Sequence, residues 1–180
     1  MKKFLLLCVV CSSLIVVFFS CEKDDICAET TPTTPELIIR FNDITSPEDT
    51  KNVTDLFAYA LDGNTAIAIS GMTVATRDSI GIPLRTDMTS TQFVLHKDYE
   101  IDDNDTPDDP SDDIVLGNPE VVTVTYEPTE VYVSRACGFK TVFNNLTFSV
   151  DLDGDNWILN SEIVSTNVEN ETAAHVKVFH

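Results

Sequence analysis

Three aspartates around a glycine are the residues of this sequence whose types and spacing most resemble a ligand set. Asp151, Asp153 and Asp155 alternate around Gly154, much as acidic side chains do in calcium-binding loops. A helix-flanked calcium loop needs glycine at its sixth position, whereas Gly154 is the fourth, counted from Asp151. Because Asp-Gly is also a common hairpin turn, the pattern predicts either a calcium site at these three aspartates or a plain turn.

A second acidic segment occupies residues 100–113 and contains no lysine or arginine. Its carboxylates and amide are hard oxygen ligands, of which calcium takes six to eight. Two prolines and closely spaced like charges are equally typical of a solvated loop between strands. We therefore predict an acidic loop, with calcium as the one cofactor that the sequence suggests and a solvated loop as the alternative.

The sequence contains few residues or motifs that are typical of catalytic sites. The chain has three histidines, His96, His175 and His180, and no G-x-S-x-G elbow, H-E-x-x-H helix or phosphate-binding glycine loop. Carboxylate pairs are abundant, but a chain this acidic has them by chance, and glycosidase chemistry needs two at a defined separation. We expect that the protein is not an enzyme, and a cryptic hydrolase of envelope polymers is the alternative.

One short string suggests a modification. Asp78-Ser79-Ile80 places a hydroxyl residue between an aspartate and an aliphatic residue, which resembles the O-glycosylation sequence of Bacteroidota. Ser79 is therefore a candidate glycosylation site, and a turn followed by a strand explains the same three residues.

The net charge restricts the partners. The sequence has 30 acidic and 11 basic residues, a formal net charge of −19. Loss of Lys2 and Lys3 with an N-terminal signal would leave 30 acidic against 9 basic residues, a net charge of −21. Nucleic-acid binding rests on neutralising phosphates with lysine and arginine, so we expect no nucleic-acid partner. Anionic membrane surfaces are also repelled, so attachment to a membrane has to come from lipid.

The first twenty residues have the composition of a secretory signal. Lys2 and Lys3 precede an apolar run over residues 4–19, and no acidic residue occurs before Glu22. A membrane-spanning helix needs about 20 apolar residues, and acidic residues follow this run where a stop-transfer segment would be basic. We predict a signal peptide at residues 1–20, with a retained membrane anchor as the alternative.

The end of this signal resembles a bacterial lipobox. In Phe18-Phe19-Ser20-Cys21 a small residue precedes a cysteine, and in such signals that cysteine becomes the lipidated first residue. Phe18 departs from the usual Leu, Val or Ile. We predict lipidation at Cys21 and attachment to the outer membrane; an ordinary signal peptide is the alternative. The string Cys21–Asp25 resembles a Bacteroidota surface-export signal and also suits a solvated tether, so both faces of that membrane are compatible with the sequence.

The remaining cysteines suggest one disulfide. Cys8 and Cys11 leave with the signal, so Cys27 and Cys137 are the two that remain beside Cys21. Two cysteines in an exported protein are read first as a bridge, and closing a loop of about 110 residues is worth about 4–5 kcal/mol in the chain-entropy model. The alternative is a pair of buried free thiols.

The rest of the chain is typical of an all-β protein. Residues 21–35 are rich in threonine and proline and predict a tether, followed by one domain over residues 36–180. We expect strands at 37–41, 53–61, 66–72, 79–84, 91–97, 121–126, 131–135, 144–151, 157–168 and 174–179, with a turn at 127–129. A short helix at 50–59 and an irregular course at 66–72 are alternatives. The pattern predicts a single antiparallel β-sandwich of about eight strands, Ig-like in general architecture.

Several strings together resemble one known family. They are Cys21–Cys27, Thr31–Pro35, Ile82–Asp87, Tyr132–Gly138 and Ala174–Lys177. With them the chain is similar to a family of uncharacterised Bacteroidota envelope lipoproteins, domain of unknown function 6452. That resemblance implies an envelope lipoprotein with no assigned activity. Residues 100–113 look like an insertion relative to the family, which argues against a family-wide role for them.

The sequence is compatible with three functions. The first is a lipid-anchored envelope protein that binds a protein or glycan partner or serves a structural role, without catalysis. The second is a calcium-dependent surface adhesin or glycan-binding module. The third is the cryptic hydrolase.

Overall fold

The computed structural model describes residues 26–31 and 33–180, which fall into two compact units. The smaller unit contains residues 26–31 and Tyr132–Phe139, and the larger unit contains residues 33–131 and Lys140–His180. Each unit is considered by itself below.

Two predicted features lie outside the described residues: the signal peptide at residues 1–20 and the lipidation site at Cys21. Within residues 26–31 and 33–180, no helix has the length and hydrophobicity needed to cross a bilayer.

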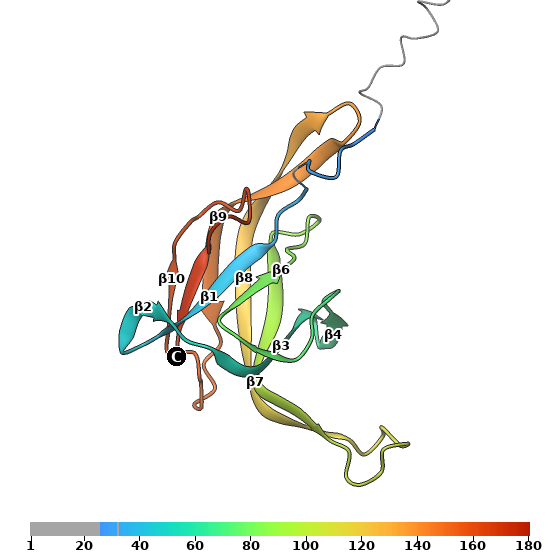
Figure 1. Ribbon diagram of the computed structural model, residues 1–180, viewed down its shortest axis with the longest axis vertical. Coiled ribbons are helices and arrows are strands. Elements are labelled where there is room, and N and C mark those ends of the chain that lie inside the picture. Colours follow the sequence, from blue (N-terminus) through green and yellow to red (C-terminus); the bar gives the residue numbers. More distant parts are fainter. Residues whose placement is uncertain (1–25, 32) are drawn as a thin grey trace, which may run out of the picture. The chain divides into compact units, whose positions relative to one another are not determined.

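The described residues form eleven strands in two sheets. The strands are β1 (Leu37–Asp43), β2 (Ser46–Thr50), β3 (Val53–Asp62), β4 (Thr65–Ala68), β5 (Ala75–Arg77), β6 (Ser79–Ile82), β7 (Ser90–Asp102), β8 (Ile114–Ser134), β9 (Gly138–Val150), β10 (Asn160–Ile163) and β11 (Val176–Phe179). The first sheet has the order β10-β11-β1-β2, with β6 also paired to β1, and the second has the order β4-β3-β7-β8-β9, with β5 paired to β3 (Figure 1). The predicted all-β fold is confirmed, with more strands than the eight or so expected.

The core of the larger unit lies between these sheets, as a sandwich requires. Both sheets contribute alternate residues of their inner faces to one buried cluster. The first sheet contributes Leu37, Ile39, Phe41, Val176 and Val178, and the second contributes Leu56, Ala58, Phe93, Leu95, Val122 and Val124. The predicted sandwich is thus confirmed, with one departure from antiparallel pairing: β1 and β11 are parallel neighbours.

The strand expected at residues 53–61 is confirmed as β3, so the alternative of a short helix at residues 50–59 is wrong. Leu56 and Ala58 are fully buried, whereas Phe57 and Tyr59 are half-buried. This period of two places alternate side chains on opposite faces of a strand, and it overrides the helical interpretation.

The expected turn at residues 127–129 is also wrong, because β8 continues through it to Ser134. Pairing between β7 and β8 ends at Ser90 and Thr125. Pro128 therefore lies where β8 has no β7 neighbour, and proline is tolerated in strands beside such a free edge because its missing N–H breaks no ladder bond.

The long strand expected at residues 157–168 is reduced to β10, four residues. Trp157 and Ile158 are adjacent and both buried, with 7% and 4% of their surface exposed, which the alternating faces of a strand in a two-layer sandwich do not allow. The backbone N–H of Trp157 donates to the carboxylate of Glu120 instead of to a neighbouring strand.

Candidate functional site

The outer face of the second sheet carries aromatic side chains that the core does not use. On β3, Phe57 and Tyr59 point away from the sandwich core because Leu56 and Ala58 point into it. Ala68 of β4 lies directly opposite Tyr59 in the ladder. Because alanine ends at its Cβ atom, the space beside the tyrosine ring is left open.

A pocket of about 330 Å³ occupies this space, and we call it the aromatic pocket. It is lined by Phe57, Tyr59, Ala66, Ala68, Tyr99 and Val115. Its walls come from four strands of one sheet, β3, β4, β7 and β8. Concave, largely apolar sites of this size are typical of places that hold an apolar part of a ligand.

A β-bulge in β7 sets the position of Tyr99. The register between β7 and β8 shifts between Lys97 and Glu100, and Asp98 has a positive φ of 53°. The bulge places the Tyr99 ring 4.7 Å from the ring of Phe57, measured between centroids. Bulges commonly re-aim a side chain next to a functional site.

Gly117, on the opposite strand, makes this bulge sterically possible. Its φ is +108°, and a Cβ atom at this position would lie only 2.4 Å from the carbonyl oxygen of Asp98. Glycine is the one residue that combines this backbone conformation with so close an approach. The sequence therefore specifies the orientation of Tyr99 through a residue on the neighbouring strand.

His96 is buried next to Tyr99. Only 4% of its surface is exposed, and its ring stands perpendicular to the Tyr99 ring at 4.9 Å. Neither ring nitrogen has a partner at full hydrogen-bonding geometry among the described residues. Burial lowers the pKa of His96 below its ordinary value, and burial raises the pKa of Tyr59. Both groups are therefore neutral at physiological pH, and the aromatic pocket is uncharged.

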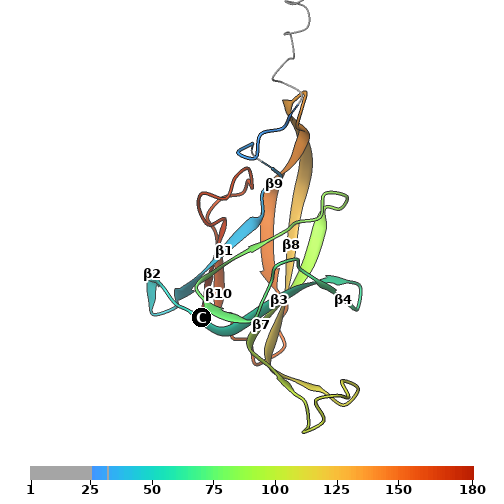
Figure 2. The same cartoon turned by 45° about the vertical axis from the view of Figure 1, so that its right-hand side comes forward.

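The strands beyond the bulge form a two-stranded extension of the second sheet, visible in yellow-green in Figures 1 and 2. Residues 98–117, which we call the acidic hairpin, contain nine acidic residues and no basic one. Ile101 and Val115 face each other across its ladder and are 51% and 53% exposed. Val115 of this apolar pair lines the aromatic pocket, and the dense negative charge of the hairpin follows directly after the pair.

The predicted acidic loop, residues 100–113, is held by its own carboxylates. Asp109 accepts hydrogen bonds from the backbone N–H and the hydroxyl of Ser111, at 3.1 and 2.6 Å. Asp112 accepts from Thr106 at 2.8 Å and from Asn104 at 3.3 Å. These donors lower the pKa of both carboxyl groups, because hydrogen bonds to a carboxylate favour its charged form.

The predicted calcium ligands Asp151, Asp153 and Asp155 lie in an exposed turn after β9. Asn156 organises this turn: its side-chain nitrogen donates to the Asp151 carbonyl at 2.9 Å, and its side-chain oxygen accepts from the Asp153 N–H at 3.3 Å. Across the described ranges, no group of three or more His, Cys, Asp or Glu side chains is arranged to hold a metal ion. Calcium binding at these aspartates stays a prediction.

Glu120 is the polar residue that the sequence interpretation missed. Only 1% of its surface is exposed, and its carboxylate accepts from the Trp157 N–H and from the Asn156 side chain, both at 2.5 Å. It thereby ties the turn after β9 to β8. The sequence could have indicated this burial, because Glu120 lies two and four residues before the inward-facing Val122 and Val124 and therefore points to the same face of β8.

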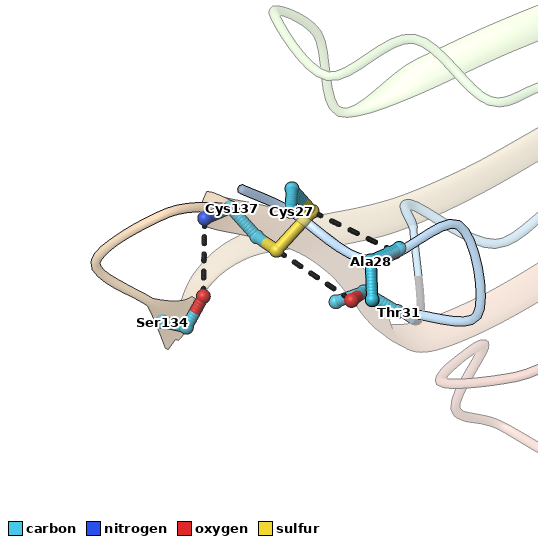
Figure 3. Close-up of a disulfide and its surroundings, with 5 residues drawn as sticks. All are labelled: Cys27, Ala28, Thr31, Ser134 and Cys137. Carbon is cyan, nitrogen blue, oxygen red and sulfur yellow. Dashed lines mark hydrogen bonds between the residues drawn. A yellow bond between two sulfur atoms is a disulfide. The ribbon is translucent and has the colours of Figure 1, made fainter. Parts of the chain in front are cut away.

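In the smaller unit, Cys27 and Cys137 are joined by a disulfide, which agrees with the predicted pairing (Figure 3). Thr31 Oγ1 lies 3.5 Å from Cys137 Sγ, and the hydroxyl is the donor because a disulfide sulfur carries no proton. The N–H of Cys137 donates to Ser134 Oγ at 3.0 Å and closes the turn between β8 and β9.

The candidate glycosylation site Ser79 is the first residue of β6 and is half-buried. It lies opposite Arg40 in the ladder with β1. A glycan attached to Ser79 would have to extend outward from one face of a strand that is paired with β1. Glycosylation at Ser79 stays a prediction.

A profile described as a family of unknown function (DUF6452) matches residues 55–180. Among curated proteins and among solved structures, no significant match is found. The matched residues contain every side chain that lines the aromatic pocket, Gly117 and Glu120. Cys21 and Cys27 precede them.

Proposed function

The chain belongs to this family of unknown function (DUF6452), and we propose that it is a lipid-anchored, non-enzymatic binding protein of the bacterial cell envelope. We assign it to the outer membrane of a member of the Bacteroidota. The aromatic pocket is the surface that receives an apolar or sugar-ring portion of a protein or glycan partner.

Support for the anchor comes from the sequence. Two lysines, an apolar run and the lipobox-like Phe18–Cys21 precede a polar tether. Several acyl chains on Cys21 would hold the protein durably, because each buried CH₂ contributes about 0.8 kcal/mol. Electrostatic attraction cannot replace them in a chain with a net charge of −19.

Support for binding without catalysis comes from the placement of the histidines. His96, His175 and His180 are each at least nine-tenths buried. His175 Nδ1 accepts the backbone N–H of Ile38 at 3.0 Å, so this ring joins β1 to the segment before β11. Burial lowers the pKa of all three histidines. The three histidines, the side chains best suited to proton transfer near neutral pH, are thus buried in the packed interior of the larger unit.

The observation that carries the proposal is the positioning of Tyr99. A bulge, a positive φ at Asp98 and an obligatory glycine at 117 are all needed to bring this ring to the pocket. Unusual backbone conformations cost free energy and concentrate at functional sites. The Tyr99 ring lies outside the sandwich core, so packing of the core does not account for the arrangement.

The test compares the lipidated wild-type protein with its Tyr99→Ala variant, both reconstituted in nanodiscs and incubated with envelope extract of the producing cells. Bound proteins and glycans are quantified by mass spectrometry. We expect the variant to lose about tenfold or more of the specifically enriched material, because a buried aromatic contact is worth about 1–2 kcal/mol.

The matched control is Leu159→Ala, which removes a side chain of the larger unit that is 61% exposed and far from the pocket in sequence. It should bind as the wild type does. Equal binding by wild type and Tyr99→Ala would overturn the assignment of the pocket.

A further inference from the structure

The smaller unit exposes apolar side chains around its disulfide. Ile26 is 84% exposed, Tyr132 57% and Phe139 64%. Tyr132 and Phe139 come from the two strands that flank the turn, and their rings meet edge to face at 5.5 Å between centroids. An edge-to-face aromatic pair held at a closed turn is a rigid apolar surface, since the rings restrict each other.

A pocket of about 390 Å³ lies within this same unit. It is lined by Ile26, Ala28, Thr31, Tyr132, Ser134, Arg135, Ala136 and Cys137. Arg135 is exposed and has no ion-pair partner within 4.0 Å among the residues that the structure describes. Its guanidinium is therefore free to bind an anionic group, and guanidinium geometry suits phosphate oxygens.

The charge of this unit differs from that of the chain. Its described residues contain one acidic residue, Glu29, and one basic residue, Arg135. The whole chain carries 19 more acidic than basic residues. The described residues of the smaller unit are thus much less negative than the chain as a whole, and the four residues before them, Glu22–Asp25, add a net charge of only −2. An anionic bilayer repels this part of the protein less than it repels the rest.

The short segment between Cys21 and the disulfide indicates that this surface faces a membrane. Cys27 follows the proposed lipid-bearing Cys21 by six positions, with five residues between them. A chain of six residues spans at most about 20 Å when fully extended. A lipid on Cys21 would therefore keep the disulfide within about 20 Å of the headgroups, and each headgroup layer is itself about 5–8 Å thick.

We propose that the disulfide-closed turn of the smaller unit is a second membrane contact, in which Ile26, Tyr132 and Phe139 enter the bilayer interface and Arg135 binds lipid phosphate. This inference rests on the proposed lipid anchor. Aromatic side chains at the headgroup level and basic side chains at the phosphates are the residues that this interface favours. The contact restrains the anchored protein at its attachment point.

Tryptophan fluorescence tests the contact in the full-length lipidated protein. The chain has one tryptophan, Trp157, which is buried and serves as an internal reference. A Phe139→Trp variant is reconstituted in phosphatidylethanolamine–phosphatidylglycerol vesicles, with or without lipids brominated near the headgroup. Leu152→Trp, at a side chain of the larger unit that is 87% exposed, is the matched control. Tyr132→Trp is the second reporter should the first variant fold poorly.

We expect the emission of the Trp added at position 139 to shift to shorter wavelength in vesicles and to lose most of its intensity with brominated lipid. The control Trp at position 152 should show neither change. Adding Arg135→Glu to the reporter variant should reduce the quenching.

Mass spectrometry of the N-terminal peptide separates the two proposals. If Cys21 carries lipid and the reporter at 139 is not quenched, the membrane contact is wrong while the anchor stands. If Cys21 carries no lipid, both proposals fail. A wavelength shift without quenching by brominated lipid indicates protein contact at this surface and also overturns the inference.

Discussion

The strand β8 begins in one hairpin and ends in another, and the two hairpins are built by opposite means. The acidic hairpin, residues 98–117, has nine acidic residues, no basic residue and no disulfide. The hairpin around Cys137 is short and is closed by the disulfide to Cys27. The described residues of its unit contain one acidic and one basic side chain. The first is shaped by a bulge and a glycine, and the second by a covalent bond.

The two hairpins therefore suit different environments, one aqueous and one apolar. Like charges along residues 98–117 repel one another and keep the hairpin in water, so its apolar pair Ile101 and Val115 stays available to a partner. The hairpin at Cys137 lacks that protection. Its exposed rings have one cationic neighbour, Arg135, and no acidic residue within the hairpin, and such rings are favoured where water gives way to an apolar phase.

The largest effect is expected from removing the disulfide. Replacing Cys27 and Cys137 with serine should lower the free energy of unfolding by about 2–5 kcal/mol, because the bridge closes a loop of about 110 residues. Chemical denaturation measures this loss. Hydrogen exchange should show faster exchange in the smaller unit and unchanged protection at residues 98–117. Equal loss of protection in both hairpins would show that they are not independent.

A second substitution tests the part of β8 between the hairpins. Glu120→Ala leaves the buried Trp157 N–H without its acceptor and removes one of the two acceptors of the Asn156 side chain, which should cost about 2–4 kcal/mol. Thermal unfolding monitored by circular dichroism measures the effect. The control Glu130→Ala removes an exposed carboxylate of the same strand and should change stability little. A harmless Glu120→Ala would mean that the carboxylate does not organise the turn after β9.

The bulge of the acidic hairpin is tested by Gly117→Ala. The added Cβ would lie 2.4 Å from the Asp98 carbonyl oxygen, so the backbone has to move at a cost of about 2–3 kcal/mol. The control Gly63→Ala has a φ of +60° but no atom within 4 Å of the added Cβ, so it should cost only about 1 kcal/mol. Calorimetric melting compares the two, and similar losses would refute the close approach as the reason for glycine at 117.

The smallest effect concerns pH. Burial lowers the pKa of His96 below the ordinary value of 6.5, so the unfolded chain takes up its proton at a higher pH than the folded chain does. The part of the free energy of unfolding that is linked to His96 is therefore fully present above about pH 6.5, and it decreases as the pH falls below that value. His96→Phe should reduce this slope between pH 7.5 and 5.5, measured by melting temperature in matched buffers. Part of the slope should remain, because burial also lowers the pKa of His175 and of His180; an unchanged slope would show that His96 does not contribute to it.

The sequence predicted the sandwich well because alternation over Val121–Tyr126 and residues 144–150 reports directly which face is buried. It failed where a local signal was overridden: Pro128 suggested a turn, but the free edge of β8 accepts it. It missed the aromatic pocket because the pocket depends on register. Nothing local shows that Tyr99 reaches Phe57, since a bulge and a glycine 18 residues away bring them together.

Photo-crosslinking at both hairpins in living cells tests the account most directly. A diazirine amino acid replaces Tyr99 in one version of the full-length protein and Tyr132 in another, and adducts are identified by mass spectrometry after irradiation. The account predicts protein or glycan adducts from position 99 and lipid adducts from position 132. Lipid adducts from position 99, or the same adducts from both positions, would contradict it.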